Sequence, residues 1–467
     1  MIGGRPLRRE SGSFRDPSSG VVWAGSRVLR HLDAEAAETF RALEAAGVLD
    51  DLARRGAVVG WQTVSPEEVD AVRALAPRTA LVLEHPTLPF VSYPYEWPFE
   101  MLRAAALLTL DIQAAALAAG FTLRDATPYN VQFLGSRPIF IDLGSFDRYR
   151  EGSPWLAYTQ FCRLFLYPLL VDALRGVPYH SLLRSSVDGL DVARVGRLLR
   201  PRDKLRPSVF RDVVVQGWLE RWSGTLAGRE DVAGAGIGKR VLLRLVDRLR
   251  TTVAGLRSGV TASHWGEYDE TSSYTAESRA VKERVVEAVV NAARPSLVWD
   301  LGCNTGRFSV AAARGAGTVV AFDADAAVVN RLAVAVRGGP GNLLPLVVDV
   351  LDPSPDQGWA GRERQALPRR GRPDLVLCLG LLHHLVVHGQ IPLPDVIGWL
   401  ADLGPELLVE FVPTDDPGFR KLVRWRLTAH HDYSAAGLEA ALGEHFTTFS
   451  RTALGSPGRV LYAATSR

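Results

Sequence analysis

Apolar positions follow different patterns in the two halves of the chain. In the C-terminal half, five short apolar runs alternate with segments of helical periodicity, and three of the runs end in an aspartate or directly precede one. The runs occupy residues 297–300, 318–323, 343–348, 374–379 and 407–412. Apolar runs separated by helices are typical of parallel strands joined by crossover helices. This half is therefore predicted to form an α/β sheet.

The N-terminal half predicts a mixed arrangement of strands and helices. Helical periodicity covers residues 33–46 and 100–120, and short strands are expected at 78–83, 131–133 and 139–141. Ser65-Pro66-Glu67-Glu68 combines an N-cap serine with a glutamate at the third helical position, which is a capping box. Residues 155–225 are expected to be mostly helical. The half therefore predicts an α+β domain over 1–225, with a small lobe to about residue 95.

A Gly/Ala-rich stretch at 227–238 separates the two halves, and a basic helix at 239–257 follows it. Val241, Leu242, Leu245 and Leu249 share one face of that helix by its periodicity. We therefore predict a linker and helix over 226–262 and a second domain over 263–467. The simplest interpretation of the arginines of this helix is that they form its solvent-exposed face. A membrane surface or an anionic acceptor remains the alternative partner.

Composition excludes several classes of protein. The 54 basic and 51 acidic residues almost cancel, which argues against nucleic acid as the main partner. The three cysteines, Cys162, Cys303 and Cys378, form no CxxC pair, so neither a disulfide scaffold nor a structural zinc site is expected. Asp111 and Gln113 interrupt the most apolar stretch, which predicts a buried helix and no transmembrane segment. We therefore expect a cytoplasmic protein.

Candidate chemistry follows the first strands of the C-terminal half. Asp300-Leu301-Gly302-Cys303-Asn304-Thr305-Gly306 joins a strand to a helix, where small residues let a ligand approach the backbone. Asp323 ends the next strand, 23 residues after Asp300, which is near the spacing of a ribose-binding acid. Asp349 follows the third strand. Carboxylates at the carboxyl ends of parallel strands line one crevice, so the pattern predicts a nucleotide-type ligand.

These residues resemble class I S-adenosylmethionine-dependent methyltransferases, which have a Rossmann-like, seven-stranded sheet. The resemblance implies an S-adenosyl-L-methionine site with no metal in this half. The implied cofactor-binding residues are Asp300, Gly302, Cys303, Asn304, Gly306, Asp323, Asp349, Val350 and Leu379. Asn304 departs from the family's middle glycine. Asp323 would hold the ribose hydroxyls, and Asp349 with the Val350 backbone would lie beside the adenine.

The C-terminal half is also similar to a nodulation-type sub-branch of that family. The lead-in His264-Trp265-Gly266-Glu267-Tyr268, the run His383-His384-Leu385 and the strand end Glu410-Phe411-Val412 carry this resemblance. Methyl transfer requires an acceptor held in line with the methyl group and, for a hydroxyl or amine, a base. His383, His384 and Glu410 are the candidate catalytic residues, in that order. Buried, purely structural histidines remain the alternative.

A second resemblance lies in the N-terminal half. Leu123-Arg124-Asp125-Ala126-Thr127-Pro128-Tyr129-Asn130 and Asp142-Leu143-Gly144 look like a protein-kinase catalytic loop and the metal-binding motif that follows it. The resemblance implies a kinase-like site at Asp125, Asn130 and Asp142 that would take ATP and Mg²⁺. The usual histidine is Leu123 and no lysine precedes Lys204, so Arg30 is the candidate substitute, with Glu38 or Glu44 as its partner.

Three functions therefore remain open. The first is methyl transfer to a small-molecule or carbohydrate acceptor. The second is a bifunctional enzyme that also transfers phosphate. The third is a non-catalytic scaffold that uses both folds for binding. No Asn/Asp-Pro-Pro-Tyr run follows the fourth strand, which disfavours exocyclic amines of DNA as acceptors.

Overall fold

The computed structural model describes residues 1–223, 236, 238–261, 275–339, 341–424, 432–455 and 458–466. The chain divides into two compact units. Unit 1 contains Met1–Phe133, Pro138–Thr261 and the short segment Asp356–Gln365, and unit 2 contains the remainder. The methyltransferase lead-in predicted at 264–268 lies outside the described residues.

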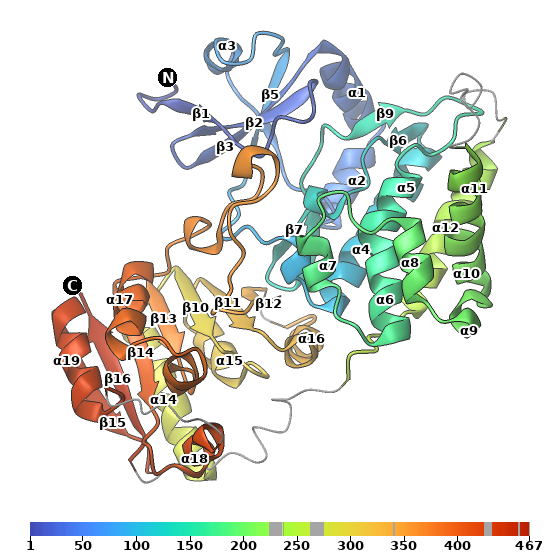
Figure 1. Cartoon of the computed structure of the whole chain (residues 1–467). Coiled ribbons are helices and arrows are strands. Elements are labelled where there is room, and N and C mark those ends of the chain that lie inside the picture. The colour runs from blue at the N-terminus through green and yellow to red at the C-terminus, as the bar shows by residue number, and fades with distance from the viewer. Residues whose placement is uncertain are drawn as a thin grey trace. The chain divides into compact units, whose positions relative to one another are not determined.

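Unit 1 begins with a five-stranded antiparallel sheet of order β1-β2-β3-β5-β4 (Figure 1). The strands are β1 (Leu7–Arg9), β2 (Ser19–Ala24), β3 (Arg27–Leu32), β4 (Gln62–Thr63) and β5 (Leu81–His85). Three helices accompany them: α1 (Ala34–Ala45), α2 (Val48–Arg54) and α3 (Pro66–Arg73). The predicted capping box is confirmed, since Ser65 and Glu68 exchange backbone and side-chain hydrogen bonds at the start of α3. The strand expected at 78–83 begins later, at Leu81, because the turn after α3 extends to residue 78.

The second part of unit 1 is mainly helical. Its long helix α4 (Phe99–Ala118) leads into two two-stranded sheets. In one, β6 (Phe121–Leu123) pairs antiparallel with β9 (Phe146–Arg148), and in the other, β7 (Val131–Leu134) pairs with β8 (Arg137–Phe140). The helices that follow are α5 (Tyr158–Phe161), α6 (Tyr167–Arg175), α7 (His180–Arg184), α8 (Val192–Leu198), α9 (Pro201–Lys204), α10 (Pro207–Val209) and α11 (Gln216–Ser223), with π-helical turns at Cys162–Leu166 and Phe210–Val215. The predicted α+β character is confirmed, while the likeness to kinases stays a prediction.

The basic helix, α12 (Lys239–Gly255), packs against α4 and belongs to unit 1. Leu242, Val246, Leu249 and Val253 form its buried face. The predicted face was wrong at Val241, which is exposed, because the buried stripe runs along Leu242 and Val246. The helix is thus part of the folded unit and not of a free linker.

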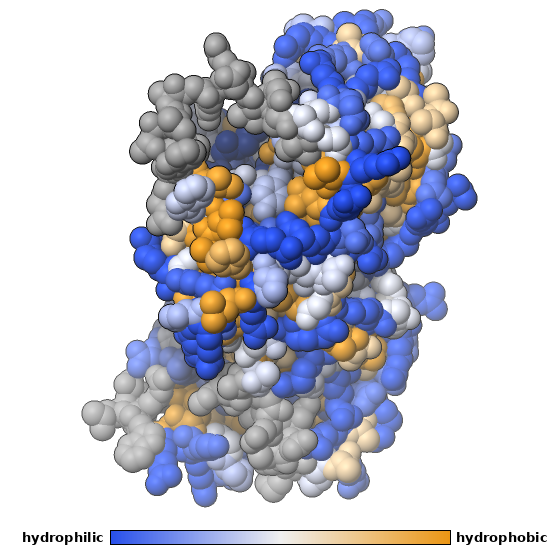
Figure 2. Space-filling view, turned by 90° about the vertical axis from the view of Figure 1, so that its right-hand side faces the viewer, coloured by the Kyte–Doolittle hydropathy of each residue, from blue (hydrophilic) through white to orange (hydrophobic). Residues whose placement is uncertain are grey.

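The described part of the chain contains one helix, α4, that is long and apolar enough to cross a membrane. More than half of its most apolar window is buried inside the fold, as in core helices of soluble proteins. On the face of the molecule in Figure 2, hydrophobic residues gather in small groups between hydrophilic ones. The helix is therefore weak evidence for a membrane span.

Unit 2 is built on a seven-stranded sheet of order β12-β11-β10-β13-β14-β16-β15. Five strands are parallel, and β16 runs antiparallel between β14 and β15. The strands are β10 (Leu297–Leu301), β11 (Thr318–Asp323), β12 (Leu343–Val347), β13 (Leu375–Cys378), β14 (Glu406–Phe411), β15 (Thr448–Ala453) and β16 (Val460–Thr465). The expected seven-stranded Rossmann-like sheet is confirmed.

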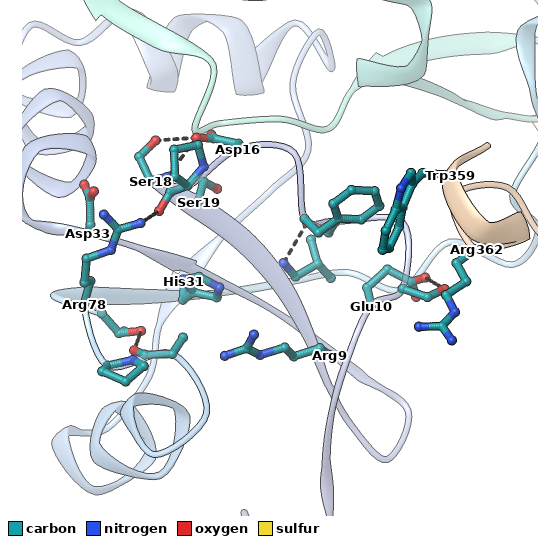
Figure 3. A pocket seen from close by; sticks show the side chains of 18 residues that line it. Arg9, Glu10, Asp16, Ser18, Ser19, His31, Asp33, Arg78, Trp359 and Arg362 are labelled. Atoms are coloured by element: carbon teal, nitrogen blue, oxygen red, sulfur yellow. Dashed lines mark hydrogen bonds between the residues drawn. The ribbon is translucent and has the colours of Figure 1, made fainter. Parts of the chain in front are cut away.

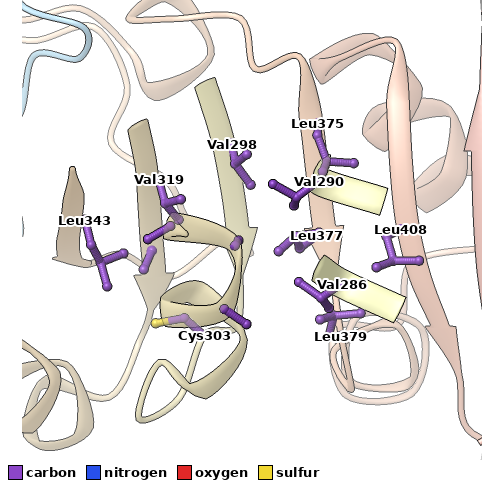
Figure 4. Close-up of a cluster of buried hydrophobic side chains, with 14 of the residues drawn as sticks. Val286, Val290, Val298, Cys303, Val319, Leu343, Leu375, Leu377, Leu379 and Leu408 are labelled. Atoms are coloured by element: carbon purple, nitrogen blue, oxygen red, sulfur yellow. The ribbon is translucent and has the colours of Figure 1, made fainter. Parts of the chain in front are cut away.

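Helices flank this sheet and bury its apolar residues. They are α14 (Ala276–Ala293), α15 (Arg307–Ala313), α16 (Ala326–Ala335), α17 (Leu393–Leu403), α18 (Pro417–Val423) and α19 (Ala435–His445). Val286 and Val290 of α14 pack onto Val298, Leu377 and Leu408 of the strands (Figure 4). This core fixes the carboxyl ends of the parallel strands, where the predicted site lies.

Candidate functional site

The loop between β10 and α15 is shaped by two glycines. Gly302 has φ 73° and Gly306 has φ 81°, both in the left-handed region that favours glycine. The backbone N–H groups of Gly302 and Cys303 both donate to the Phe322 carbonyl of β11, at 2.9 Å. A Cβ on Gly306 would come within 2.4 Å of the Leu332 side chain. The loop is therefore held in one tight conformation beside the neighbouring strand.

Asp323 stabilises the same loop from the end of β11. One of its carboxylate oxygens accepts a hydrogen bond from the Asn304 N–H and the other accepts from the Asp325 N–H, each at 2.9 Å. Burial raises the pKa of this carboxyl, and the backbone donors oppose that shift. A carboxylate can accept about four hydrogen bonds, so Asp323 retains capacity for ribose hydroxyls. The prediction for Asp323 fits this geometry.

Asp300 lies deeper than Asp323, at 2% exposure. Its carboxylate accepts a hydrogen bond from the Ser309 hydroxyl at 2.5 Å. Burial raises the pKa of Asp300 to about 6, and the Ser309 hydrogen bond and the Lys282 charge act against this rise. Asp300 therefore ties β10 to α15 and shapes the loop from below.

The other predicted cofactor residues also follow the carboxyl ends of parallel strands. Asp349 is exposed after β12 and accepts from the Leu351 N–H at 2.9 Å, with Val350 beside it. Leu379 is buried just after β13. A Cβ on Gly302 would lie 3.2 Å from Leu381, so the loops after β10 and β13 are close neighbours. These strand ends form one edge, which suits an adenosine-type ligand.

Cys303 was predicted as a cofactor-binding residue through the loop sequence. Its side chain is 7% exposed and belongs to the hydrophobic core under the sheet (Figure 4). Burial raises the pKa of its thiol well above the usual value, so the thiol stays protonated. Only its backbone is therefore available to a ligand.

The two predicted histidines lie directly after β13, where a π-helical turn (His384–His388) begins. His383 is 2% exposed, and its Nδ1 has no hydrogen-bond partner among the described residues. Burial lowers the pKa of His383 well below its usual value and that of His384 to about 4. Both imidazoles are therefore neutral near pH 7, which is the form that accepts a proton.

Glu410, the third predicted base, lies in a different environment from the one its position suggested. Its side chain is fully buried, and its two oxygens contact Lys282 Nζ at 2.6 Å and an Arg459 Nη at 3.1 Å. Arg459 also binds Asp416 through Nε at 2.8 Å. Because two cations hold both oxygens, we no longer propose Glu410 as the base. Its role is to bind α14 and the β15–β16 turn to the strand end.

Lys282 and Arg459 were not predicted from the sequence as residues of this site. One signal was present: Lys282 occupies the helical stripe of Ser278, Val286 and Val290, at i, i+4 spacing. A lysine on a buried stripe requires a buried anion. Among the described residues, no group of three or more His, Cys, Asp or Glu side chains could hold a metal ion.

In unit 1, the three predicted kinase-like residues gather around Ser145 and Gln160. Asn130 Nδ2 donates to the Ser145 hydroxyl at 3.0 Å, and that hydroxyl donates to Asp142. Gln160 donates to Asp125 at 3.4 Å. The pKa of Asp125 is raised mainly by burial and secondly by the charge of Asp142. The predicted proximity of these groups is therefore present.

Arg30 has a partner other than the one predicted. It binds Asp142 at 2.7 Å and also donates to Ser19 Oγ and the Ile141 carbonyl. Glu38 instead faces Arg148 and Glu44 accepts from Trp61, so the predicted partners were wrong. The reason is that side chains alternate along β3 and Arg30 points toward the loop that carries Asp142. The Arg30 guanidinium therefore contacts an oxygen of Asp142, the residue predicted to bind a metal ion.

No family model matches. The chain is 35% identical to nodulation protein NoeA of Rhizobium meliloti (strain 1021) over 458 residues, which is 97% of this chain and 95% of that protein.

Solved methyltransferases match part of the chain at low identity. The N-methyltransferase NodS of Bradyrhizobium japonicum WM9 matches 41% of this chain and 97% of its own, at 13% identity and a TM-score of 0.30. The magnesium protoporphyrin IX methyltransferase of Synechocystis PCC 6803 with bound S-adenosylmethionine matches 41% of this chain and 82% of its own, at 21% identity and a TM-score of 0.28. The bifunctional kinase-methyltransferase WbdD matches 47% of this chain and 46% of its own, at 21% identity and a TM-score of 0.31.

Proposed function

We propose that this chain, which belongs to the family of nodulation protein NoeA, carries an S-adenosylmethionine-dependent methyltransferase unit that methylates a hydroxyl or amine of a small-molecule or carbohydrate acceptor. One observation carries the proposal: the loop from Gly302 to Gly306 and the carboxylate of Asp323 meet at adjacent strand ends in a hydrogen-bonded arrangement. The loop lacks the GxGxxG spacing of a dinucleotide site.

Different residues of unit 2 would have different roles in such a reaction. S-adenosylmethionine supplies a methyl group on a sulfonium, which is a good leaving group. Asp323 and Asp349 would hold the ribose and adenine, and the glycine loop admits the ligand close to the backbone. The acceptor oxygen or nitrogen forms its bond to the methyl carbon as the carbon–sulfur bond breaks, with the reacting atoms in line.

The acceptor must lose a proton in this reaction. His383 and His384 follow β13, the strand that lies beside β10. The unpartnered Nδ1 of His383 is the first candidate to take the proton, and His384 is the second. Burial lowers the pKa of both imidazoles, so each is neutral and able to accept a proton, but the same burial makes each a weaker base that would hold the proton only transiently.

For unit 1 we propose an acceptor-binding scaffold in place of a phosphotransferase. Arg30 contacts one oxygen of Asp142 and Ser145 donates to the other. Mg²⁺ binding at Asp142 would therefore require these contacts to break. The kinase-like arrangement of Asp125, Asn130 and Asp142 is the observation that keeps phosphate transfer as the second candidate.

Calorimetry of S-adenosylmethionine binding to the full chain tests the proposal. Wild type is expected to bind, and Asp323→Asn is expected to bind about tenfold or more weakly, because a charge-assisted hydrogen bond to the ribose is lost. Asp352→Asn, which changes an exposed acid three residues after Asp349, is the matched control and should bind as wild type does. Absence of binding by the folded wild type would contradict the proposal.

A further inference from the structure

Unit 1 contains a cavity of about 460 Å³ that the reaction above does not use. It lies beside the end of β1, the loop before β2, His31 of β3, the turn after α3 and the segment Asp356–Gln365 (Figure 3). Its volume lies within the range of about 300–1,000 Å³ that is usual for small-molecule sites. All of these elements belong to the same compact unit.

This pocket adjoins the Arg30–Asp142 site at Ser19, which lines the pocket and accepts a hydrogen bond from Arg30. Successive side chains of a strand point to opposite faces of the sheet. Arg30 reaches Asp142 on one face, so His31 points to the other face, where α3 packs against the sheet. The pocket therefore extends to the face of the sheet that carries His31, and Ser19 connects it to the Arg30–Asp142 site.

Internal hydrogen bonds hold the loop between β1 and β2 in shape. Glu10 accepts from the Trp23 indole at 2.6 Å and from the Gly12 N–H at 3.3 Å. Asp16 accepts from Ser18 and from Arg124, each at 2.7 Å. These two carboxylates are largely satisfied within the protein, which leaves the arginines of the pocket to interact with a ligand.

The segment Asp356–Gln365 is also held in place. Glu363 accepts from Arg15, the Gln365 N–H donates to the Tyr93 hydroxyl at 2.8 Å, and Arg364 lies over the Tyr129 ring at 5.2 Å. These contacts hold the segment that contains Trp359. The Trp359 side chain is 65% exposed, and its ring centroid lies 5.7 Å from that of Phe14. Phe14 lies on the loop between β1 and β2, so two exposed aromatic rings from two segments that are held in place meet here, which is a feature of ligand sites.

The pocket combines three kinds of group. Arg9, Arg78 and Arg362 carry guanidinium donors, and the first two use one N–H each on a backbone carbonyl. Asp33 uses one carboxylate oxygen to cap α1, so its other oxygen can accept a hydrogen bond. Phe14 and Trp359 add apolar rings. A matching ligand carries an anion for the arginines, hydroxyl donors for the acid and an apolar ring face.

We propose that this pocket binds an anionic sugar, either a uronic acid or a sugar phosphate, as the end of a carbohydrate acceptor. A sugar of this class presents all three kinds of group within one ring. A bare anion would leave the aromatic rings unused, and a neutral sugar would leave the arginines unmatched. This inference rests on the proposed function for its link to methyl transfer, and it assigns acceptor recognition to unit 1.

Saturation-transfer NMR on the full chain tests the pocket, with glucuronic acid and glucose 6-phosphate as probes. Both are expected to bind, with glucose and inorganic phosphate much weaker. Arg9→Gln and Trp359→Ala are each expected to weaken binding about tenfold, through loss of a charged donor or of the ring contact. Two matched controls should not change sugar binding. They are Arg8→Gln, at the residue before Arg9 in β1, and Trp218→Ala, at another exposed tryptophan.

Three results would overturn the inference: neither acidic sugar binds, all four variants behave alike, or inorganic phosphate or AMP binds as well as the sugars. S-adenosylmethionine binding measured on the same samples separates this inference from the proposed function. Loss of sugar binding with cofactor binding intact defeats the pocket alone. Sugar binding without cofactor binding defeats methyl transfer and leaves the pocket standing.

Discussion

Gly306 shows how one residue couples the loop of unit 2 to its packing. Its φ of 81° is a conformation that L side chains rarely adopt, and an added Cβ would meet Leu332 atoms at 2.4 and 2.6 Å. We predict that Gly306→Ala lowers the free energy of unfolding by about 1–3 kcal/mol, through strain and overpacking. It should also weaken S-adenosylmethionine binding, because the loop must shift. Urea unfolding and calorimetry measure the two effects.

The matched control for this change is Gly443→Ala in α19. Nothing lies within 4 Å of a Cβ at this position, and its φ is not positive. Alanine in a helix is favoured over glycine by about 0.5–1 kcal/mol, so this variant should be as stable as wild type or slightly more stable. Equal destabilisation by both variants would show that Gly306 has no special role.

His180 gives the protein a pH dependence that can be measured. It is half-buried, its ring Nε2 bonds the Trp97 carbonyl at 3.0 Å, and the loss of solvent around the ring lowers its pKa to about 4. The unfolded state, with a pKa near 6.5, binds more protons over that interval. Stability should therefore fall as pH drops from about 6.5 to 4, by up to about 1.4 kcal/mol per pH unit for this group.

The variant His180→Gln should remove this contribution. Its free energy of unfolding is expected to fall less steeply than that of wild type between pH 6.5 and pH 4, as measured by urea titrations at several pH values. Other histidines, such as His85 with a pKa of about 4, titrate in both proteins and cancel in the comparison. Parallel pH curves for the two proteins would contradict the assignment.

Individual residues were predictable from sequence where their neighbours in space are also near in sequence. Asp323 and Asn304 are 19 residues apart, and one strand–loop–strand pattern was enough to bring them together. Glu410 was misinterpreted because its partners lie 128 and 49 residues away, at Lys282 and Arg459. Periodicity placed Glu410 at a strand end, but it carries no information on which cations converge there.

At the scale of elements, the ion pair between α14 and β14 is buried on both sides. Lys282 is 2% exposed and Glu410 is fully buried. We predict that Lys282→Met destabilises unit 2 by about 3–5 kcal/mol, because it removes one of the two cations that balance a buried carboxylate. The double variant Lys282→Met/Glu410→Gln should lose less than the sum of the two single changes. Additive effects in this double-mutant cycle would show that the pair is not coupled.

The helix α12 offers a second test with its own control. Arg248 makes two contacts, at 2.6 and 2.9 Å, with Asp212, which is 1% exposed and also accepts from Tyr158. We predict that Arg248→Met costs about 2–4 kcal/mol in the urea unfolding of unit 1, since a buried carboxylate loses its cation. Arg250→Met, two residues on, breaks only an exposed pair with Asp111 and should cost less than about 1 kcal/mol.

Equal costs for the two arginine variants would contradict this account of α12. The helix itself was predictable from its periodicity, but its buried face was not. Leu245 and Val246 are adjacent apolar candidates, and the choice between them depends on the surface of α4. An apolar stripe of this kind predicts more reliably that a helix is present than which face of the helix is buried.

At the scale of the whole molecule, the order of folded regions was predictable, but the full membership of each unit was not. The segment Asp356–Gln365 lies between β12 and β13 in sequence and clusters with unit 1. It has neither helical nor strand periodicity, and its contacts with Tyr93 and Tyr129 span more than 200 residues. Only tertiary packing shows that Trp359 lies beside Phe14.

The two units should respond differently to nucleotide ligands. A ligand present at about 100 times its Kd stabilises the unit that binds it by about 2.7 kcal/mol. We predict this gain for unit 2 with S-adenosylmethionine and none for unit 1 with ATP and Mg²⁺, because Arg30 and Ser145 engage both oxygens of Asp142. Urea unfolding of the full chain with each ligand, followed by hydrogen exchange to assign the protected unit, measures both effects.

The variants Asp142→Ala and Arg30→Ala decide what a response to ATP would mean. Stabilisation of wild-type unit 1 by ATP and Mg²⁺ that disappears in Asp142→Ala would contradict the scaffold proposal and favour the phosphotransferase. Stabilisation that is absent from wild type and gained in Arg30→Ala would support the scaffold proposal, since removing the guanidinium frees one Asp142 oxygen for the metal. In that case the Arg30–Asp142 ion pair, which is 8% and 18% exposed, is what keeps a kinase-like arrangement from binding a metal nucleotide.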